Sequence, residues 1–387
     1  MAGEEQMNRL VLIGNGFDLA HKLKTNYSDF IFNLIKESII ETISNYNENN
    51  LNPKKTNNLI NFKTTKDTSH TNSLIEDIEK IDSSNNNKIN ALFSLLPDYN
   101  IEKEDSPDFL NDLINEYQNN NWVDIEGEYF NELLNIFNSV YDTSKKNNKK
   151  TVSRLIEQLN KSIDRLNMEL KKYLDPIKTP VTSSKFQLPL HTFFEKCFDK
   201  LTKDELTALN LDIRQLDPEN IMFLDFNYTN TVHQYVKHYK NAHHVQIHGS
   251  LRESKIIFGY GDDSHQNYQD LENEGNPELL RHIKSFQYPS NYNYHKFLNF
   301  IEHKEFDVFI VGHSCGLSDR TMLRTIFNHQ NCKGIKIFVK EDNDKESQLQ
   351  EHFYKTIAVS RHFKEKSEMR KKIIPYDING VITQVKK

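Results

Sequence analysis

The feature that most constrains the fold is an apolar run near the start of the chain that lies far from every other strand-like segment. Residues 9–13 are short, mostly apolar and followed by glycine, which is typical of a strand buried in a parallel sheet. The next strand-like run begins only at Ile221. Because one strand and one helix cannot bury a core, the first strand must pair with later strands across the intervening residues.

Short apolar runs that alternate with loops or helical stretches make up the later part of the chain. This alternation predicts an α/β fold, a mostly parallel sheet with helices on both faces. A last run, 381–385, follows Asn379-Gly380 and is expected to add an edge strand. The other predicted strands are 221–226, 245–248, 255–259, 307–312 and 334–339.

A large, mainly helical insertion is expected between the first strand and the later ones. Residues 47–100 are rich in Asn, Lys, Ser and Thr, as in 49–52 and 85–87, and favour loops with short helices. We therefore divide the chain into 1–46 (first strand, turn and helix), 47–200 (insertion), 201–345 (rest of the sheet domain) and 346–387 (C-terminal helix and edge strand). Helical spacing occurs at 27–46, 108–117, 126–141 and 152–174.

The composition excludes several classes of protein. The 387 residues include 49 Lys and Arg against 55 Asp and Glu, a net charge of -6, so general nucleic-acid binding is not expected. Cys197, Cys315 and Cys332 are far apart, which argues against a zinc ribbon or a disulfide framework. The apolar run 10–13 is too short for a signal peptide or a membrane span. A cytoplasmic protein that does not bind membranes is expected.

The first predicted strand ends in Gly14-Asn15-Gly16-Phe17-Asp18. Open α/β sheets bind ligands at this position, where small residues let a phosphate approach the backbone. The dehydrogenase fingerprint is incomplete, because Leu19 stands where its third glycine belongs and no acidic ribose ligand follows at the usual distance. The motif alone fits a tight strand-to-helix turn equally well.

Asn227 follows the strand predicted at 221–226. Its carboxamide can donate and accept hydrogen bonds, which suits orienting a water molecule or a ribose hydroxyl. The alternative is a helix N-cap, because Asn and Thr are both favoured before a helical run such as 232–239.

His248, followed by Gly249 and Ser250, ends the next predicted strand. An imidazole that is neutral near pH 7 can accept a proton from water or from a sugar hydroxyl, so His248 is the best candidate for a general base. His244 would share its strand face, which raises a metal site as an alternative. No third ligand has a convincing spacing, and no metal is expected.

The strand at 307–312 leads into Gly312-His313-Ser314 and then Ser318-Asp319. Ser314 and the backbone around Gly312 could bind a phosphate or a ribose, and Ser318 or Asp319 would cap the next helix. Gly312, Ser314 and Gly316 also match the nucleophile elbow of serine hydrolases. His352 and His362 lie downstream, but no acidic partner and histidine follow in a persuasive setting.

Taken in order, these four segments resemble sirtuin-like proteins. The opening, Ile13 to His21 followed by Tyr27-Ser28-Asp29-Phe30, is more narrowly similar to the bacteriophage abortive-infection AbiH family. The segments 226–229, 247–249 and 311–319 agree with that family. The motifs cover a small part of the chain, but all of them lie at predicted strand ends.

The resemblance implies a sirtuin-like, Rossmann-type fold and, in antiphage defence, an NAD hydrolase (NADase) that releases nicotinamide and ADP-ribose. It places Asn227 and His248 on the catalytic Asn and His, and Asp18 is expected to stabilise the ribose or the developing charge. Protein deacylation is not expected, because the chain lacks the four cysteines of the sirtuin zinc module. The expected NAD-binding residues are Gly14, Asn15, Gly16, Phe17, Gly249, Gly312, Ser314 and Asp319.

A nucleotide-sensing module is the alternative, in which the same pocket binds NAD or an ADP-ribose-like signal without chemistry. Under either hypothesis we expect a homo-oligomer and a phage-derived activator or partner protein. The helical insertion is a candidate lid, oligomer contact or phage sensor.

Overall fold

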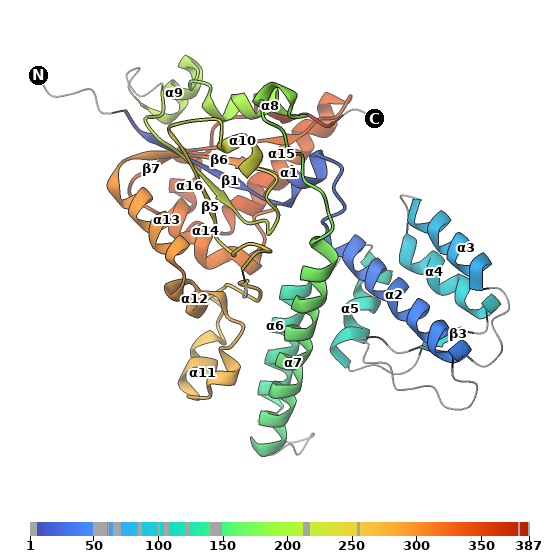
Figure 1. The fold of residues 1–387 in the computed structure, drawn as a ribbon. Helices are drawn as coiled ribbons and strands as arrows, with labels where there is room; N and C mark the ends of the chain where they lie inside the picture. The colour runs from blue at the N-terminus through green and yellow to red at the C-terminus, as the bar shows by residue number, and fades with distance from the viewer. Residues whose placement is uncertain are drawn as a thin grey trace, which may run out of the picture. The chain divides into compact units, whose positions relative to one another are not determined.

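The structure, a computed structural model, contains two compact units (Figure 1). The sheet unit consists of Met1–Lys24, Ile177–Gly275 and Leu280–Lys387, and the helical unit of Thr25–Pro176 and Asn276–Leu279. The residues that the structure describes are 6–48, 60, 62–64, 71–83, 87–99, 101–103, 108–120, 124–139, 149–211, 217–253, 256–377 and 380–385.

A parallel five-stranded sheet forms the centre of the sheet unit, in the order β5-β4-β1-β6-β7. The first strand, β1, lies in the middle and pairs with β4 on one side and β6 on the other. The predictions of a parallel sheet and of a first strand that joins the later ones are therefore confirmed. The strands are β1 (Asn8–Ile13), β4 (Ile221–Asp225), β5 (Ala242–Gln246), β6 (Phe306–Val311) and β7 (Cys332–Ile337).

Helices cover both faces of this sheet, as predicted (Figure 1). Successive side chains of a strand point to opposite faces, so β1 sends Leu10 and Leu12 into one core and Val11 and Ile13 into the other. The first core contains side chains of α13 (Tyr292–His303), α14 (Arg320–Phe327) and α15 (Lys345–Ser360). The second contains side chains of α8 (His191–Glu195), α9 (Lys203–Leu209) and α10 (His233–Val236).

Three strand predictions need correction. The strand predicted at 245–248 is β5, which begins at Ala242 and ends at Gln246, so His248 lies beyond it. Residues 256–259 form no strand, because Gly259 has a φ of +146°, and Lys255 lies outside the described residues. The last run pairs outside the main sheet, with β8 (Val339–Lys340) bound to β9 (Val381–Ile382).

A buried ion pair explains why an arginine occupies the apolar strand β1. Arg9 is fully buried, and its Nη2 lies 2.7 Å from a carboxylate oxygen of Asp307 in β6. The guanidinium also donates to the carbonyls of Cys197 and Asp199 and lies 3.8 Å from the centre of the Phe309 ring. Its charge and donors are thereby matched without water.

The helical unit packs around long amphipathic helices. Asn26 caps the start of α2, because its side chain accepts a hydrogen bond from the Asp29 N–H at 2.7 Å. The predicted Asn-rich segments 49–52 and 85–86 lie outside the described residues, as do positions 140–141 of the predicted third helix. The elements are α2 (Tyr27–Glu48), β2 (Phe62–Thr64), α3 (Thr71–Ser83), α4 (Lys88–Leu95), η1 (Leu96–Tyr99), β3 (Ile101–Lys103), α5 (Asp108–Asn120), α6 (Ile125–Asn138), α7 (Lys149–Leu174) and η5 (Pro277–Leu279).

The unit boundaries differ from the division at residues 47 and 200. The helix α2 belongs to the helical unit because it contacts α7, β2 and α3. Residues 177–211 belong to the sheet unit, since α8 and α9 supply its second core. The remaining elements of the sheet unit are α1 (Asn15–Ala20), η2 (Lys185–Gln187), η3 (Lys196–Phe198), α11 (Tyr268–Asn273), α12 (Lys284–Gln287), η6 (Tyr288–Ser290), η7 (Leu317–Asp319) and α16 (Lys366–Lys372).

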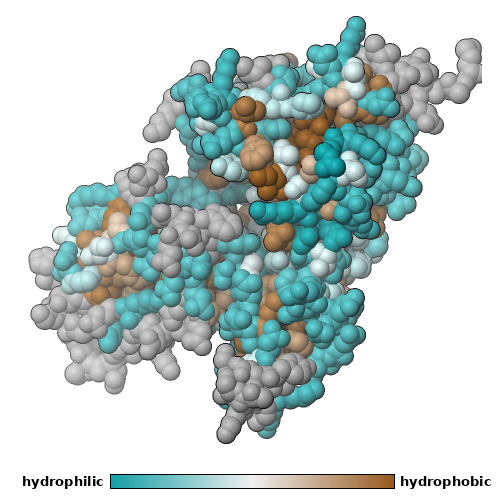
Figure 2. Space-filling model, turned by 180° about the vertical axis from the view of Figure 1, so that it is seen from behind, coloured by the Kyte–Doolittle hydropathy of each residue, from teal (hydrophilic) through white to brown (hydrophobic). Residues whose placement is uncertain are grey.

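The surface seen in Figure 2 is mostly hydrophilic, with hydrophobic side chains in separate groups. Within the described residues, none of the helices has the length and apolar character needed to cross a membrane.

Candidate functional site

All four motifs singled out in the sequence lie at one edge of the main sheet. The strands β5, β4, β1 and β6 are neighbours and run parallel, so their carboxyl ends meet at that edge. The Gly14 turn follows β1, Asn227 follows β4, His248 follows β5 and Gly312 follows β6. The structure therefore brings together loops that are far apart in the chain, at the position where open α/β sheets bind ligands.

The glycine turn after β1 packs directly on the loop after β6. A Cβ atom at Gly14 would lie 2.5 Å from the Cα of His313, and one at Gly16 would lie 2.7 Å from the Cα of Gly312. Gly312 has a φ of +71°, a conformation that favours glycine. These three positions require glycine because two backbones approach each other without room for side chains.

The backbone N–H groups of this turn already have protein partners. Gly14 donates to Val311, Gly16 donates to Gly312 at 2.8 Å, and Phe17 donates to Gly14. In this arrangement the three groups hold the turn rather than point to a phosphate. The glycine turn is thus a tight strand-to-helix turn held by packing, which is one of the two roles that the motif alone allows.

The short helix α1 turns two of the predicted site residues into the interior. Phe17 is fully buried in the second core, where its ring contacts those of His21 and Tyr235. Its side chain therefore contributes to packing. Asp18 is 1% exposed, and the Thr229 hydroxyl donates to its Oδ2 at 2.6 Å.

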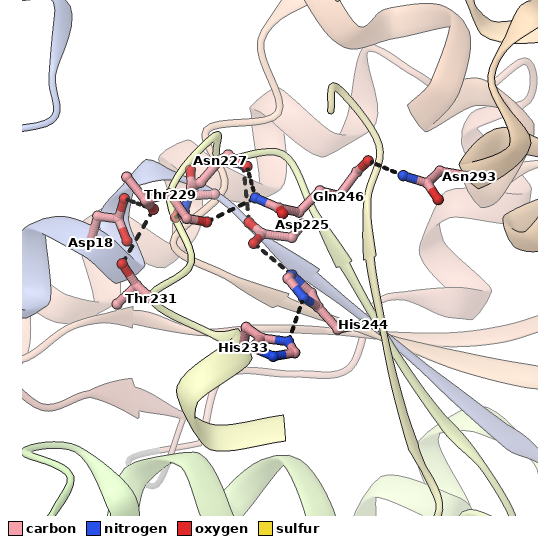
Figure 3. A network of polar contacts seen from close by, with 10 residues as sticks. Asp18, Asp225, Asn227, Thr229, Thr231, His233, His244, Gln246 and Asn293 are labelled. Atoms are coloured by element: carbon pink, nitrogen blue, oxygen red, sulfur yellow. Dashed lines mark hydrogen bonds and ion pairs between the residues drawn. The ribbon is translucent and has the colours of Figure 1, made fainter. Parts of the chain in front are cut away.

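Asp18 forms no ion pair among the described residues, and its side chain lies next to those of Thr229 and Thr231 (Figure 3). Burial raises its pKa to about 7, although hydrogen bonds from Thr229 and Thr231 oppose the shift. The charge of Asp225 adds to the increase. The other oxygen, Oδ1, has no hydrogen-bond partner among the described residues. Asp18 thus exchanges its proton near neutral pH.

A second polar chain connects Asp225 to the outer strand β5 (Figure 3). Asp225 is buried at the end of β4 and lies 2.9 Å from Nε2 of His244, whose Nδ1 lies 3.3 Å from Nδ1 of His233. Burial raises the pKa of Asp225, and His244 opposes that shift. The Asp225 carboxylate also accepts a hydrogen bond from the N–H of Asn227.

Asn227 is held at the centre of the edge by its own hydrogen bonds. It is 9% exposed, and its Nδ2 donates to the Gly14 carbonyl at 3.2 Å. Gln246 donates from its Nε2 to the Asn227 carbonyl. The helix-cap alternative is wrong, because α10 begins after Val232, five residues further along the chain.

His248 belongs to a separate buried group on the other side of Phe226. Its Nε2 lies 3.1 Å from the Tyr288 hydroxyl and 3.3 Å from Oδ1 of Asp319. The Phe226 ring stands edge-on to the rings of both His248 and His313. Burial lowers the pKa of His248 and Lys284 lowers it further, while Asp319 opposes them. The imidazole is therefore neutral at pH 7.

Lys284, in the short helix α12, supplies the charge that organises this group. It is fully buried, and its Nζ lies 2.7 Å from Oδ1 of Asp319. Burial by itself would raise the pKa of Asp319, but Lys284, His248 and His313 together hold that pKa well below its usual value. Sequence reasoning missed Lys284, because a single lysine between predicted elements resembles an exposed surface residue.

Asp319 and Ser314 also have surroundings that the sequence did not predict. Asp319 lies at the N-terminus of α14, but its side chain makes no capping hydrogen bond and binds Lys284 instead.

Ser314 is exposed, whereas His362 hydrogen-bonds to the Cys315 carbonyl and His313 accepts from the Cys315 N–H. The described contacts therefore contain no hydrogen bond between Ser314 and a histidine that would support the serine-hydrolase alternative.

The predicted site residues thus fall into two groups that share one sheet edge. Asp18 and Asn227 lie with Asp225 and His244, whereas His248 and Asp319 lie with Lys284. Gly249, with a φ of +82°, forms the turn after His248. No hydrogen bond joins Asn227 to His248 among the described contacts.

The structure separates the two histidines that the sequence suggested as metal ligands. His244 faces Asp225 and His233, whereas His248 faces Tyr288 and Asp319, so the pair considered in the sequence is divided between the two groups. Across the part of the chain that the structure describes, no cluster of three His, Cys, Asp or Glu side chains could hold a metal.

Comparison with known proteins identifies one family. A family model described as bacteriophage abortive infection AbiH matches residues 10–341, well over half of the chain. No curated protein matches the chain, and no solved structure does.

Proposed function

The chain belongs to the bacteriophage abortive infection AbiH family, and we propose that it acts in this defence by hydrolysing NAD to nicotinamide and ADP-ribose. One observation carries the proposal: adjacent parallel strands bring the Gly14 turn, Asn227, His248 and the Gly312–Ser314 loop to one edge of a Rossmann-like sheet. The proposed site is of the sirtuin-like kind and acts on cytoplasmic NAD, in a homo-oligomer that a phage component activates.

The reaction replaces one bond at the nicotinamide ribose. The bond between C1′ and the pyridinium nitrogen breaks, its electron pair neutralises the nicotinamide ring, and C1′ becomes oxocarbenium-like. A water oxygen then forms a bond to C1′ and releases one proton. Because nicotinamide is already a good leaving group in the cationic dinucleotide, positioning and electrostatic stabilisation account for most of the required catalysis.

His248 suits the role of proton acceptor. Its imidazole is neutral at pH 7, and the ionised Asp319 beside it would stabilise the imidazolium that forms. His248 is only 4% exposed, so water can reach its Nε2 only after the Tyr288 hydroxyl moves away. Substrate binding must therefore shift the segment that contains Lys284 and Tyr288.

Asn227 and Asp18 would act on the ribose side of the substrate. The Asn227 carboxamide would orient the attacking water or a ribose hydroxyl after exchanging its bond to the Gly14 carbonyl. Asp18 would stabilise the developing positive charge when it is ionised. Because the N–H groups of Gly14, Gly16 and Phe17 are already paired, the exposed Ser314 and the loop around Gly312 are the better candidates to contact phosphate or adenosine.

The test is NAD loss by the purified full-length chain, with and without phage lysate, measured as free nicotinamide by chromatography. His248→Gln and Asn227→Ala should each reduce turnover at least a hundredfold. His191→Ala, which changes a histidine of α8 outside both groups of predicted site residues, is the matched control and should retain activity. Thermal unfolding confirms that each variant folds. Undiminished NAD cleavage in both site variants would contradict the assignment.

A sensor function is the second candidate, and the burial of His248 and Asn227 favours it. Both side chains are already hydrogen-bonded within the protein, as expected for residues that hold a binding loop. In this case the protein binds NAD or ADP-ribose without consuming it. Calorimetry that detects saturable binding, while nicotinamide stays absent in the presence of phage lysate, would favour the sensor.

A further inference from the structure

The outer strand of the sheet, β5, borders a cavity that none of the predicted site residues lines. The cavity has a volume of about 1150 Å³ and lies between β5 and the helices α10 and α13. Because β5 is the last strand in the order β5-β4-β1-β6-β7, only one of its edges is paired. An unpaired edge offers backbone donors and acceptors to a further strand.

The register of β5 shows which backbone groups face this cavity. The Ile221 N–H donates to the Asn241 carbonyl, and β4 and β5 run parallel in this register. Backbone groups of a parallel strand alternate between its two edges. Those of Ala242, His244 and Gln246 therefore point away from β4.

Among the described residues, most of these outward groups have no hydrogen-bond partner. The Gln246 carbonyl accepts a hydrogen bond from Nδ2 of Asn293 at 2.9 Å. No described residue forms a hydrogen bond with the N–H or C=O groups of Ala242 or His244. Two consecutive outward positions are thus open to a strand that enters from the side of Ala242.

The cavity is positively charged in a protein whose net charge is -6. Lys237, Arg252 and Lys296 line it together with four histidines, and neither Asp nor Glu does. No ion pair neutralises these three cations among the described residues. Inside the cavity, His233 and His244 form the outer end of the polar chain that begins at Asp225 (Figure 3).

The sequence of β5 does not protect its edge. Exposed edge strands commonly carry lysine or proline, which discourages pairing with another chain. Residues 242–246 are Ala-His-His-Val-Gln and contain neither. The cations instead lie at the sides of the groove, directly after α10, on α13 and in the loop after β5, where they can attract an acidic chain.

From these observations we infer that an extended, acidic segment of another protein adds to β5 as a further strand. Main-chain hydrogen bonds to Ala242 and His244 supply the pairing, and Lys237, Arg252 and Lys296 select negative side chains. Five residues of β5 span roughly 16 Å, enough for a short peptide. The inference does not depend on NAD hydrolysis, because none of the proposed catalytic residues lines the cavity.

A short fluorescein-labelled peptide in which Asp or Glu alternates with Val or Thr is the probe, and fluorescence anisotropy with the full-length chain is the measurement. The peptide should bind saturably, and more weakly as salt increases. Two control peptides isolate the causes. In the first, methylation of alternate backbone nitrogens removes the N–H donors needed for strand pairing without changing the charge of the peptide. In the second, Lys replaces the acidic residues, so the peptide no longer complements the positive charge of the groove. Neither control peptide should bind.

Ala242→Pro tests the pairing directly. Proline is tolerated at the first residue of an edge strand, and here it removes an N–H that points away from β4. Binding should weaken at least tenfold, whereas the matched variant Ala242→Val should bind within about twofold of the original chain. Lys237→Glu combined with Lys296→Glu should also weaken binding at least tenfold, and Lys203→Glu on α9 should not. Circular dichroism verifies the fold of each variant.

Three results would overturn the inference. One is the absence of saturable peptide binding, or equal binding by Ala242→Pro and Ala242→Val. Another is a concentration-dependent dimer that Ala242→Pro dissociates, which would make a second copy of this chain the occupant. The third is tight binding of an oligothymidylate that displaces the peptide and is unaffected by Ala242→Pro, which would indicate a groove for single-stranded nucleic acid.

Discussion

Two buried polar groups lie at the same edge of one sheet, yet their carboxyl groups have opposite protonation behaviour. Near His248, the ammonium of Lys284 lies 2.7 Å from Asp319 and holds its pKa well below the usual value. In the other group, the side chain of Asp18 has only hydroxyl partners among the described residues, and burial raises its pKa to about 7. The side chain of Asp319 is 13% exposed and Asp18 is 1% exposed, but the main contrast is in their partners: Lys284, followed by His248 and His313, keeps Asp319 charged, whereas Asp18 has an exchangeable proton.

The largest expected effect is the loss of that lysine. Lys284→Met leaves Asp319 as a buried carboxylate without its cation, which should lower the free energy of unfolding by about 3–5 kcal/mol at pH 7. Urea denaturation measures the change.

The double variant Lys284→Met with Asp319→Leu should recover part of the loss, because no charge is then buried. Lys296→Met, at an exposed lysine of α13, is the control and should change stability by less than about 0.5 kcal/mol. A loss below about 1 kcal/mol in Lys284→Met would mean that the charge of Asp319 does not depend on Lys284.

The second prediction concerns Asp18 and pH. Its pKa is higher in the folded state than its ordinary 3.8, so the folded protein binds the proton more tightly and loses stability as pH rises from about 4 to 7. A rise from 3.8 to about 7 corresponds to at most about 4 kcal/mol. Asp18→Asn should remove this loss and be more stable than the original chain at pH 8.

Urea unfolding at pH 5 and at pH 8 compares the two proteins. Asp263→Asn, at an exposed aspartate, should leave the pH dependence unchanged. If Asp18→Asn shows the same decrease in stability between pH 5 and 8 as the original chain, Asp18 is not the group that titrates.

The smallest of the three effects concerns Asp225. His244→Ala removes the imidazole that lies 2.9 Å from this buried carboxylate, which should cost about 1–3 kcal/mol at pH 7. Because an unpaired Asp225 is more easily buried when it is protonated, the cost should decrease at pH 5. His243→Ala, at the exposed neighbouring residue of β5, provides the control for thermal unfolding. Equal stabilities of the two alanine variants would show that His244 does not support Asp225.

Much of the architecture could be predicted from the sequence, because strand burial and strand ends leave clear patterns. The apolar runs at 9–13, 221–226 and 307–312 have no polar alternation, which indicates burial on both faces and hence a parallel sheet. Parallel strands place their carboxyl ends on one edge, so the meeting of Gly14, Asn227, His248 and Gly312 followed without coordinates.

Other features had no local signal. The start of β5 at Ala242 was missed because His243 and His244 interrupt the apolar pattern, although both residues lie in register with β4. Phe17 appears within a glycine motif, yet its ring belongs to the second core because α1 turns it inward.

The sequence by itself determined the layered α/β architecture, the pairing of the first strand with later strands and the gathering of four loops, because hydrophobic periodicity can be recognised in short segments and parallel strands end at one edge. The central position of the first strand emerged only from the structure. Only the tertiary structure decided the charges at that edge. Whether Asp319 is a helix cap or an ion-pair partner depends on Lys284, which is 35 residues away in the chain. Desolvation and pairing depend on distances in space, and Lys284 and Asp319 come together only when α12 folds against η7.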